Sequence, residues 1–246
     1  AQSLKPVGLE LGGKSAVIVF DDADLMLAAK KGITGAVSSN GQGCVNGTRL
    51  LVQRGVYEKY LGILSAVAGS IKVGDPFDQQ TNLGPVINER ALDRILGMVA
   101  SGQAEGGRIV TGGARLDGDH AAGFFLPVTI LADVPNTAHI AQNEVFGPVL
   151  VVTPFDSEDE AIALANATDY GLGAYVHTQN LRRAHYVTSQ LNAGMIHVNG
   201  AGEAMQPNCP FGGFKKSGHG RLGGVEGLHE FLQPKNIWMN LAAPEG

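Results

Sequence analysis

The sequence predicts an α/β fold in which a mostly parallel sheet is flanked by helices. Short apolar runs rich in β-branched residues, such as 14–20 and 149–155, alternate with longer segments that carry apolar residues at helical spacing. This alternation is typical of a parallel sheet covered by helices on both faces. The 246 residues have a hydrophobic content of 44%, which is enough to fill the core of one large domain or two small ones.

The first third of the chain contains two predicted strands and two predicted helices. An aspartate in front of Ala23, in the pair Asp21 and Asp22, is expected to cap the first helix, and the acidic first turn suits the helix dipole. In order, these elements are a strand over 14–20, a helix over 23–39, a strand over 48–53 and an amphipathic helix over 56–71.

The same alternation continues after a polar loop over 73–85. Asn88 is expected to cap one helix, and Ser157 with Glu160 forms the capping box of another. The predicted elements are a helix over 88–101, a strand over 108–111, an exposed loop over 116–123, an extended segment over 124–131, a strand over 149–155, a helix over 158–167, a strand over 174–177, a helix over 180–191, a strand over 195–199 and a last strand over 235–240.

Charge and composition exclude several classes of function. The formal net charge is -5, from 18 Lys and Arg against 23 Asp and Glu, so nucleic acid and an anionic membrane are not expected partners. No apolar stretch approaches the ~20 residues that a membrane span needs. Two distant cysteines form no disulfide framework, which predicts a cytoplasmic protein. The histidines lack metal-ligand spacing, so no metal site is predicted.

A glycine-rich turn around Cys44 is the strongest chemical signal. The stretch 38–49 reads Ser-Ser-Asn-Gly-Gln-Gly-Cys-Val-Asn-Gly-Thr-Arg and joins the first predicted helix to the second predicted strand. A cysteine in such a turn can expose its sulfur, while neighbouring backbone N–H groups point at the molecule that the sulfur attacks. The alternative is a structural cysteine that packs as a small apolar residue.

Three further stretches accompany this turn. They are 9–14 (Leu-Glu-Leu-Gly-Gly-Lys), 143–148 (Asn-Glu-Val-Phe-Gly-Pro) and 210–218 (Pro-Phe-Gly-Gly-Phe-Lys-Lys-Ser-Gly). In order and spacing, the four stretches resemble the C-terminal half of the aldehyde dehydrogenase superfamily. The resemblance implies the catalytic-domain fold of that family, a catalytic domain over 15–234, and a C-terminal oligomerisation strand and tail over 235–246. It also implies that 1–14 is the remnant of a missing cofactor-binding domain.

The resemblance implies a role for each motif. Cys44 would be the nucleophile and Glu10 the base that activates water. The other implied site residues are Glu144, Phe146, Leu11 and Gly12 for the cofactor, and Gly43, Val45 and Phe211 for the substrate pocket. The cofactor would be NAD or NADP, the substrate a small-molecule aldehyde, and the assembly a homodimer or homotetramer.

Other interpretations of these residues stay open. Glu10 on its own fits a surface glutamate, although a carboxylate between Leu9 and Leu11 is expected to be partly desolvated, which would raise its pKa. Glu144 fits an ordinary turn, and Phe211 fits core packing. An acylating enzyme that passes the thioester to coenzyme A or phosphate, or a non-catalytic assembly module, are the alternative functions. Because no strand–glycine–helix unit precedes Lys14, the chain alone is expected to be inactive.

Overall fold

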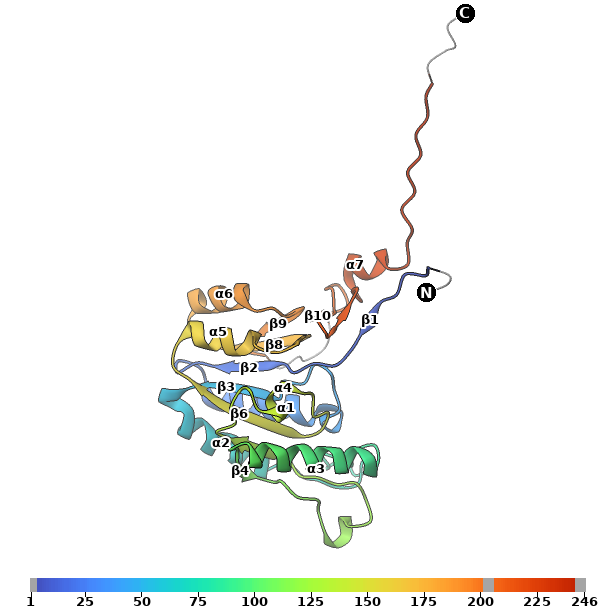
Figure 1. Cartoon of the computed structure of the whole chain (residues 1–246). Helices are drawn as coiled ribbons and strands as arrows, with labels where there is room; N and C mark the ends of the chain where they lie inside the picture. Colours follow the sequence, from blue (N-terminus) through green and yellow to red (C-terminus); the bar gives the residue numbers. More distant parts are fainter. Residues whose placement is uncertain (1–3, 201–205, 242–246) are drawn as a thin grey trace, which may run out of the picture.

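A computed structural model describes residues 4–200 and 206–241 of the chain. Its centre is a seven-stranded sheet in the order β4-β5-β6-β3-β2-β8-β9, and all neighbouring strands are parallel except β4 and β5 (Figure 1). The mostly parallel α/β fold is therefore confirmed. The strands are β2 (Ala16–Val19), β3 (Arg49–Gln53), β4 (Arg108–Thr111), β5 (Thr129–Ala132), β6 (Val149–Phe155), β8 (Gly173–His177) and β9 (Met195–Val198).

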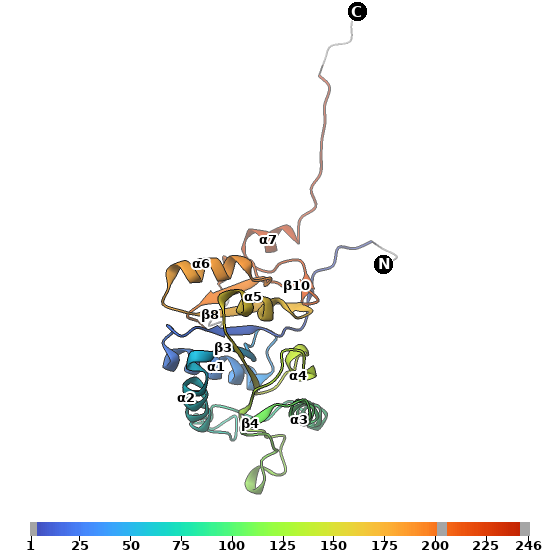
Figure 2. The same cartoon turned by 60° about the vertical axis from the view of Figure 1, so that its left-hand side comes forward.

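Helices cover both faces of the sheet, because the central strands present apolar side chains alternately to each side. Val17 and Val19 of β2 pack against α1 and α2, whereas Ala16 and Ile18 pack against α5 and α6. Helices α3 and α4 cover the β5–β6 end of the second face (Figure 2). The helices are α1 (Leu25–Val37), α2 (Tyr57–Gly69), α3 (Glu89–Ala104), α4 (His139–Gln142), α5 (Glu158–Asn166), α6 (Leu181–Gln190) and α7 (Gly224–His229).

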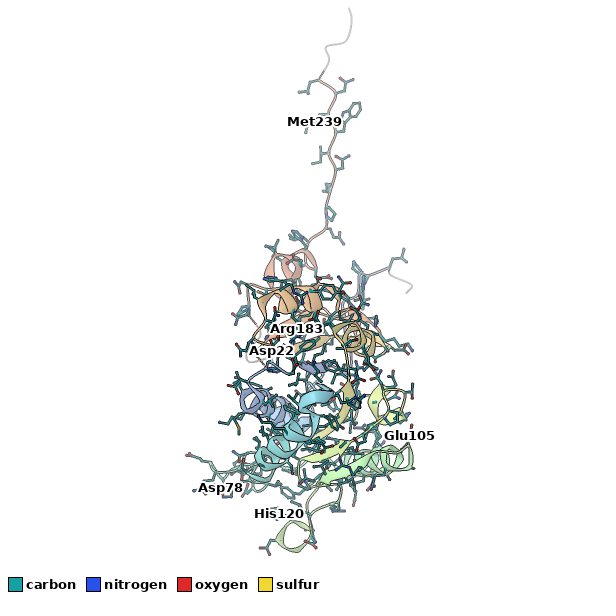
Figure 3. All side chains as sticks on the ribbon, turned by 90° about the vertical axis from the view of Figure 1, so that its left-hand side faces the viewer. Asp22, Asp78, Glu105, His120, Arg183 and Met239 are labelled. Atoms are coloured by element: carbon teal, nitrogen blue, oxygen red, sulfur yellow. The ribbon has the colours of Figure 1, made fainter. Side chains whose placement is uncertain are left out.

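The cap of α1 differs from the prediction. Asp24, rather than an aspartate in front of Ala23, accepts the hydrogen bond from the N–H of Leu27, at 2.9 Å. The helix therefore begins two residues later, and its first turn carries no acidic residue. Asp22 instead lies just past the end of β2, where it binds the side chain of Arg183 at 2.9 Å (Figure 3). The Asp22 carboxylate thus forms a tertiary ion pair instead of capping the helix, which is the role that the sequence predicts for an aspartate in front of Ala23.

The other two predicted caps are present. Asn88 accepts a hydrogen bond from the N–H of Ala91 at the start of α3, and Ser157 accepts one from the N–H of Glu160 at the start of α5. The carboxylate of Glu160 reaches back to the N–H of Asp156, one residue before the cap residue. Three short 3-10 helices complete the list of helical segments, η1 (Ser38–Gly41), η2 (Arg54–Val56) and η3 (Gly118–His120).

Two small strand pairs join the C-terminal part of the chain to the rest. Strand β1 (Leu9–Glu10) pairs with β11 (Gly218–His219), and β7 (Tyr170–Gly171) pairs with β10 (Phe214–Lys215), both antiparallel. The 9–14 motif is thereby attached to the 210–218 motif. Among the residues that the structure describes, no helix is long and apolar enough to cross a membrane.

The last predicted strand is absent. Residues 232–241 form neither helix nor strand and extend away from the body of the chain (Figures 1 and 3). The side chains of Ile237, Trp238 and Met239 are 67%, 83% and 70% exposed. The alternation of apolar and polar residues there is suited to a strand, but a strand forms only when a neighbouring strand accepts its hydrogen bonds. The remainder of the predicted tail, 242–246, lies outside the described residues, as do residues 1–3 of the predicted remnant.

Candidate active site

The candidate site lies at the amino ends of three neighbouring strands. Lys14 precedes β2, the Cys44 turn precedes β3, and Glu144 precedes β6. Because β2, β3 and β6 are adjacent and parallel, their amino ends share one edge of the sheet. Motifs separated by up to about 130 residues therefore meet there. Ligands of open α/β sheets more often bind at the opposite, carboxyl edge.

Cys44 occupies a tight turn. The N–H of Asn46 donates to the carbonyl of Gly43 at 3.2 Å, which places Cys44 and Val45 at the two central positions of a β-turn. The side-chain amide of Asn46 donates to the carbonyl of Ser38 at 3.2 Å, which ties the end of the turn to the end of the preceding helix. The Cys44 side chain is half-buried and forms no disulfide.

A glycine at position 41 lets this turn approach the 143–148 motif. Gly41 has a φ of 74°, in the left-handed region that suits glycine. A Cβ at this position would collide with the backbone of Gly147 and Pro148. The close approach therefore requires a residue without a side chain.

Glu144 is held by the glycine pair of the 9–14 motif. The N–H of Gly13 donates to Oε1 of Glu144 at 3.1 Å, and a Cβ at Gly12 would collide with Oε2. Burial raises the pKa of the Glu144 carboxyl, while the Gly13 N–H and the cations Lys14 and Arg94 oppose that rise. The same glycine pair adjoins the nucleophile turn, since a Cβ at Gly13 would collide with the carbonyl oxygen of Cys44.

The electrostatics around Cys44 favour the protonated thiol. Burial is the largest cause that raises its pKa, and the carboxylates of Glu144 and Glu10 raise it further. The backbone N–H groups of Cys44 and Val45 face the sulfur and lower the pKa, but they do not reverse the shift. The site therefore has hydrogen-bond donors for an anion at this position, whereas no cation of the described residues lowers the pKa of Cys44.

Glu10 lies at the end of β1 and is more exposed than the sequence predicted. Leu9 and Leu11 are 45% and 48% exposed, so they do not enclose the carboxylate. The pKa of Glu10 is nevertheless raised by partial desolvation, against the opposing charge of Arg221. A Cβ at Gly212 would lie 2.9 Å from Oε1 of Glu10, which places this carboxylate beside the 210–218 motif.

The remaining predicted site residues surround this arrangement. Gly43 and Val45 flank Cys44 in its turn, and Phe146 has a φ of 50° and is 37% exposed. Phe211 exchanges two backbone hydrogen bonds of 2.7 Å with Leu222. Its side chain lines an open hollow of about 330 Å³, together with Met195, Ile196, His197, Gln206, Cys209 and Pro210. The N–H of Leu11 donates to the carbonyl of Ser217.

Two residues of this region were not predicted from the sequence. Lys14 is 2% exposed, its Nζ has no hydrogen-bond partner among the described residues, and burial together with the charge of Arg49 lowers its pKa to about 7. Tyr175 of β8 is 2% exposed and donates a hydrogen bond of 2.7 Å to the carbonyl of Val45. Lys14 belongs to the 9–14 motif, so the sequence offered a reason to consider it as a site residue. Tyr175 lies in an ordinary apolar strand pattern, which gives no such reason.

No group of three or more His, Cys, Asp or Glu side chains within the described ranges is placed to hold a metal ion. The chemistry available at this edge of the sheet therefore consists of one thiol, two carboxylates with raised pKa values, and backbone donors around the sulfur.

Comparison with known proteins shows the family of the chain. Residues 1–237 match the model of the aldehyde dehydrogenase family. The structure superimposes on an NAD-dependent aldehyde dehydrogenase from Sinorhizobium meliloti with a TM-score of 0.95 and 38% identity, over 100% of this chain and 48% of that one. A Mycobacterium tuberculosis aldehyde dehydrogenase complexed with NAD+ gives a TM-score of 0.93 and 40% identity, over 99% and 50%.

A third similar structure is a mutant of aldehyde dehydrogenase C from Pseudomonas syringae in complex with NAD+ and octanal. It has a TM-score of 0.90 and 41% identity, over 94% of this chain and 47% of that one. The present chain thus spans about half the length of the solved structures that it matches.

Proposed function

We propose that this chain, which belongs to the aldehyde dehydrogenase family, supplies the catalytic portion of an enzyme that oxidises an aldehyde to a carboxylate with NAD or NADP. One observation carries the proposal. The sulfur of Cys44 faces two backbone N–H groups, and Glu144 and Glu10 lie close enough to influence its pKa. In this proposal Cys44 is the nucleophile, the two N–H groups are the oxyanion donors, Glu144 is the carboxylate that binds the cofactor, and Glu10 is the base.

The chemistry begins at Cys44. The thiol first loses its proton to solvent, and the resulting thiolate adds to the carbonyl carbon of the aldehyde. The oxyanion that forms accepts a hydrogen bond from the backbone N–H of Cys44. Loss of a hydride converts this adduct to a thioester. Water then adds to the thioester carbon, Glu10 accepts a proton from that water, and the thiolate leaves as the carboxylate product forms.

The residues present fit the nicotinamide end of a dinucleotide. Glu144 uses one carboxylate oxygen for the N–H of Gly13, and among the described residues Oε2 accepts no hydrogen bond, so it is available for a ribose hydroxyl. Phe146 presents an exposed ring two residues away. When bound, the cofactor supplies the hydride acceptor and, in its oxidised form, a positive charge on the ring. Relatives bound to NAD+ support this assignment.

The two cysteines of the chain offer a matched test in the complete enzyme. Cys44→Ser should abolish NAD(P)-dependent aldehyde oxidation without changing the denaturation midpoint. Cys209→Ser, at the other and exposed thiol, should leave the activity near that of the wild type. If Cys44→Ser retains near-wild-type turnover, Cys44 is not the nucleophile and the proposal fails.

We further propose that the 246 residues alone do not sustain turnover. They span about half the length of the relatives. The family resemblance also implies a second oxyanion donor from a motif that the 246 residues do not contain. Loss of one such donor typically lowers kcat by about 10² to 10³. Sustained cofactor-dependent oxidation by the purified chain would overturn this part of the proposal.

A further inference from the structure

Tyr175 connects the central sheet to the nucleophile turn. It lies in the middle of β8, 2% exposed, and its hydroxyl donates a hydrogen bond of 2.7 Å to the carbonyl of Val45. The two residues are 130 positions apart in the sequence. A Cβ at Gly47 would lie 3.0 Å from the Tyr175 ring, so the absence of a side chain at position 47 permits this approach.

Val45 is the residue through which this hydrogen bond affects Cys44. The Val45 N–H faces the sulfur of Cys44 together with the N–H of Cys44 itself. On the other side of Val45, the next peptide is fixed twice, since Tyr175 binds its carbonyl oxygen and Gly43 binds the N–H of Asn46. Fixing that peptide plane restricts the rotation of Val45 and hence the direction of its N–H.

We propose that Tyr175 is a positioning residue for the nucleophile, whose hydroxyl holds the turn so that the backbone N–H groups of Cys44 and Val45 face the sulfur and the oxyanion formed beside it. This inference deepens the proposed function and rests on Cys44 as the nucleophile. Tyr175 does not touch the reacting atoms. Burial, and secondarily the charge of Cys44, raise the pKa of its hydroxyl, so the hydroxyl stays a donor across the working pH range.

The alternative is that Tyr175 only packs in the core. Its ring belongs to the cluster that includes Val17, Val19 and Leu50, so removal of the whole side chain would not separate the two roles. Tyr175→Phe keeps the ring and removes only the hydroxyl. The chain also offers a matched control, because Tyr57 is a buried tyrosine whose hydroxyl bonds to Asp133 and to the carbonyl of Val152, in the middle of β6, and no bond to the Cys44 turn is among these.

The test measures the alkylation rate of Cys44 by iodoacetamide as a function of pH in the full 246-residue chain. Cys209→Ser is present in every variant, because the exposed Cys209 thiol would otherwise react as well. In Tyr175→Phe, we expect the midpoint of the pH–rate profile to rise by at least half a pH unit, which makes alkylation about threefold slower below the midpoint. In Tyr57→Phe, the midpoint should stay at the wild-type value.

Burial of the sulfur, the two backbone N–H groups, and the carboxylates of Glu144 and Glu10 set the midpoint, and neither substitution removes any of these groups. Tyr175→Phe differs from Tyr57→Phe in that it releases the peptide that holds the Val45 N–H. An unchanged midpoint in Tyr175→Phe, or an equal shift in both variants, would overturn the positioning role. If Cys44 of the wild type is not alkylated at any pH tested, Cys44 is not the nucleophile, and the inference fails together with the proposed function. If Cys44 is alkylated but its midpoint is the same with Tyr175 and with Phe at position 175, only the positioning role of Tyr175 is rejected, and the proposed function stands.

If Tyr175→Phe does not fold, a second measurement tests whether the Tyr175 hydroxyl is coupled to the nucleophile turn. Ortho-fluorotyrosine placed at position 175 alone keeps both the ring and the hydroxyl. Its fluorine resonance should shift with the same midpoint as Cys44 alkylation, and Cys44→Ala should remove that shift. A resonance that does not move through the titration of Cys44 would show that the hydroxyl is not coupled to the nucleophile turn, and would overturn the inference.

Discussion

The N–H of Gly13 donates a hydrogen bond of 3.1 Å to Oε1 of Glu144, which joins two motifs that lie 131 residues apart. The adjacent Gly12 leaves room for the same carboxylate, because a Cβ there would collide with Oε2. The 9–14 motif thus fixes both the direction of the carboxylate and its distance from the nucleophile turn.

Gly12→Ala should displace the Glu144 carboxylate with little effect on the fold. The colliding atoms belong to the end of a flexible side chain, so the side chain can move while the backbone stays in place. We expect the KM for the cofactor in the complete enzyme to rise about tenfold, equivalent to roughly 1.4 kcal/mol of binding free energy. Cys44 should still be alkylated in the absence of cofactor, with a shifted midpoint, because the Glu144 carboxylate contributes to the pKa of Cys44. An unaltered cofactor KM would contradict the role of Glu144.

Gly41→Ala should destabilise the whole chain. Alanine is strained at a φ of 74°, and its Cβ would collide with the backbone of Gly147 and Pro148, which cannot rotate away. We expect a loss of about 3 kcal/mol in the free energy of unfolding, measured by denaturant titration. The control is Gly97→Ala on α3, where nothing lies within 4 Å of the added Cβ. That change should stabilise the chain by about 0.5–1 kcal/mol.

Glu10→Gln should slow hydrolysis of the thioester more than its formation. The amide cannot accept the proton of the attacking water, whereas addition of Cys44 to the aldehyde does not require Glu10. The complete enzyme should give a rapid burst of reduced cofactor and then a slow steady state in stopped-flow measurements. Loss of the burst with unchanged cofactor binding would instead place Glu10 in the first half of the reaction.

Lys14→Met should stabilise the chain at low pH. Burial lowers the pKa of Lys14 from 10.5 to about 7, so the folded chain binds fewer protons than the unfolded chain between those values. The stability of the wild type therefore rises with pH across this window, and the penalty for the buried ammonium is fully present only below about pH 7. The difference between the two pKa values corresponds to a penalty on the order of 5 kcal/mol.

The measurement for Lys14→Met is the denaturant midpoint at several pH values between about pH 6 and pH 10. The stability gained by the substitution should be largest at the acidic end and should shrink towards the alkaline end. The buried cation Arg49 is present in both proteins, so its own lowered pKa largely cancels in the comparison. A gain that is independent of pH would show that Lys14 stays charged and paired in the folded chain across this pH range.

The C-terminal tail should cause the chain to self-associate. Trp238 and its apolar neighbours Ile237 and Met239 are exposed, and their extended backbone is suited to pair with a strand of another copy. We expect dimers or larger species in sedimentation at micromolar concentration, consistent with the proposed homodimer or homotetramer. Deletion of 236–246 should give a monomer if the tail is responsible. A clean monomer of the undeleted chain would reject this prediction.

The sequence by itself indicated most strands of the central sheet, most of the helices that cover it, and the motifs of the candidate site. The central strands are apolar at nearly every position, and caps such as Asn88 and Ser157 act through hydrogen bonds three residues away, so both leave a local pattern. The motifs around Glu10, Cys44 and Glu144 are also contiguous segments, and they are recognisable before any contact between them is known.

The tertiary structure alone decided how these segments meet. The common amino edge of β2, β3 and β6, the ion pair that diverts Asp22 from the cap of α1, and the hydrogen bond from Tyr175 to Val45 all join residues distant in sequence. The exposure of Glu10 and the unpaired extended tail also depend on which surfaces lie nearby. Hydrogen bonds within a helical turn are encoded by neighbouring residues, whereas burial and long-range pairing exist only once the whole chain has packed.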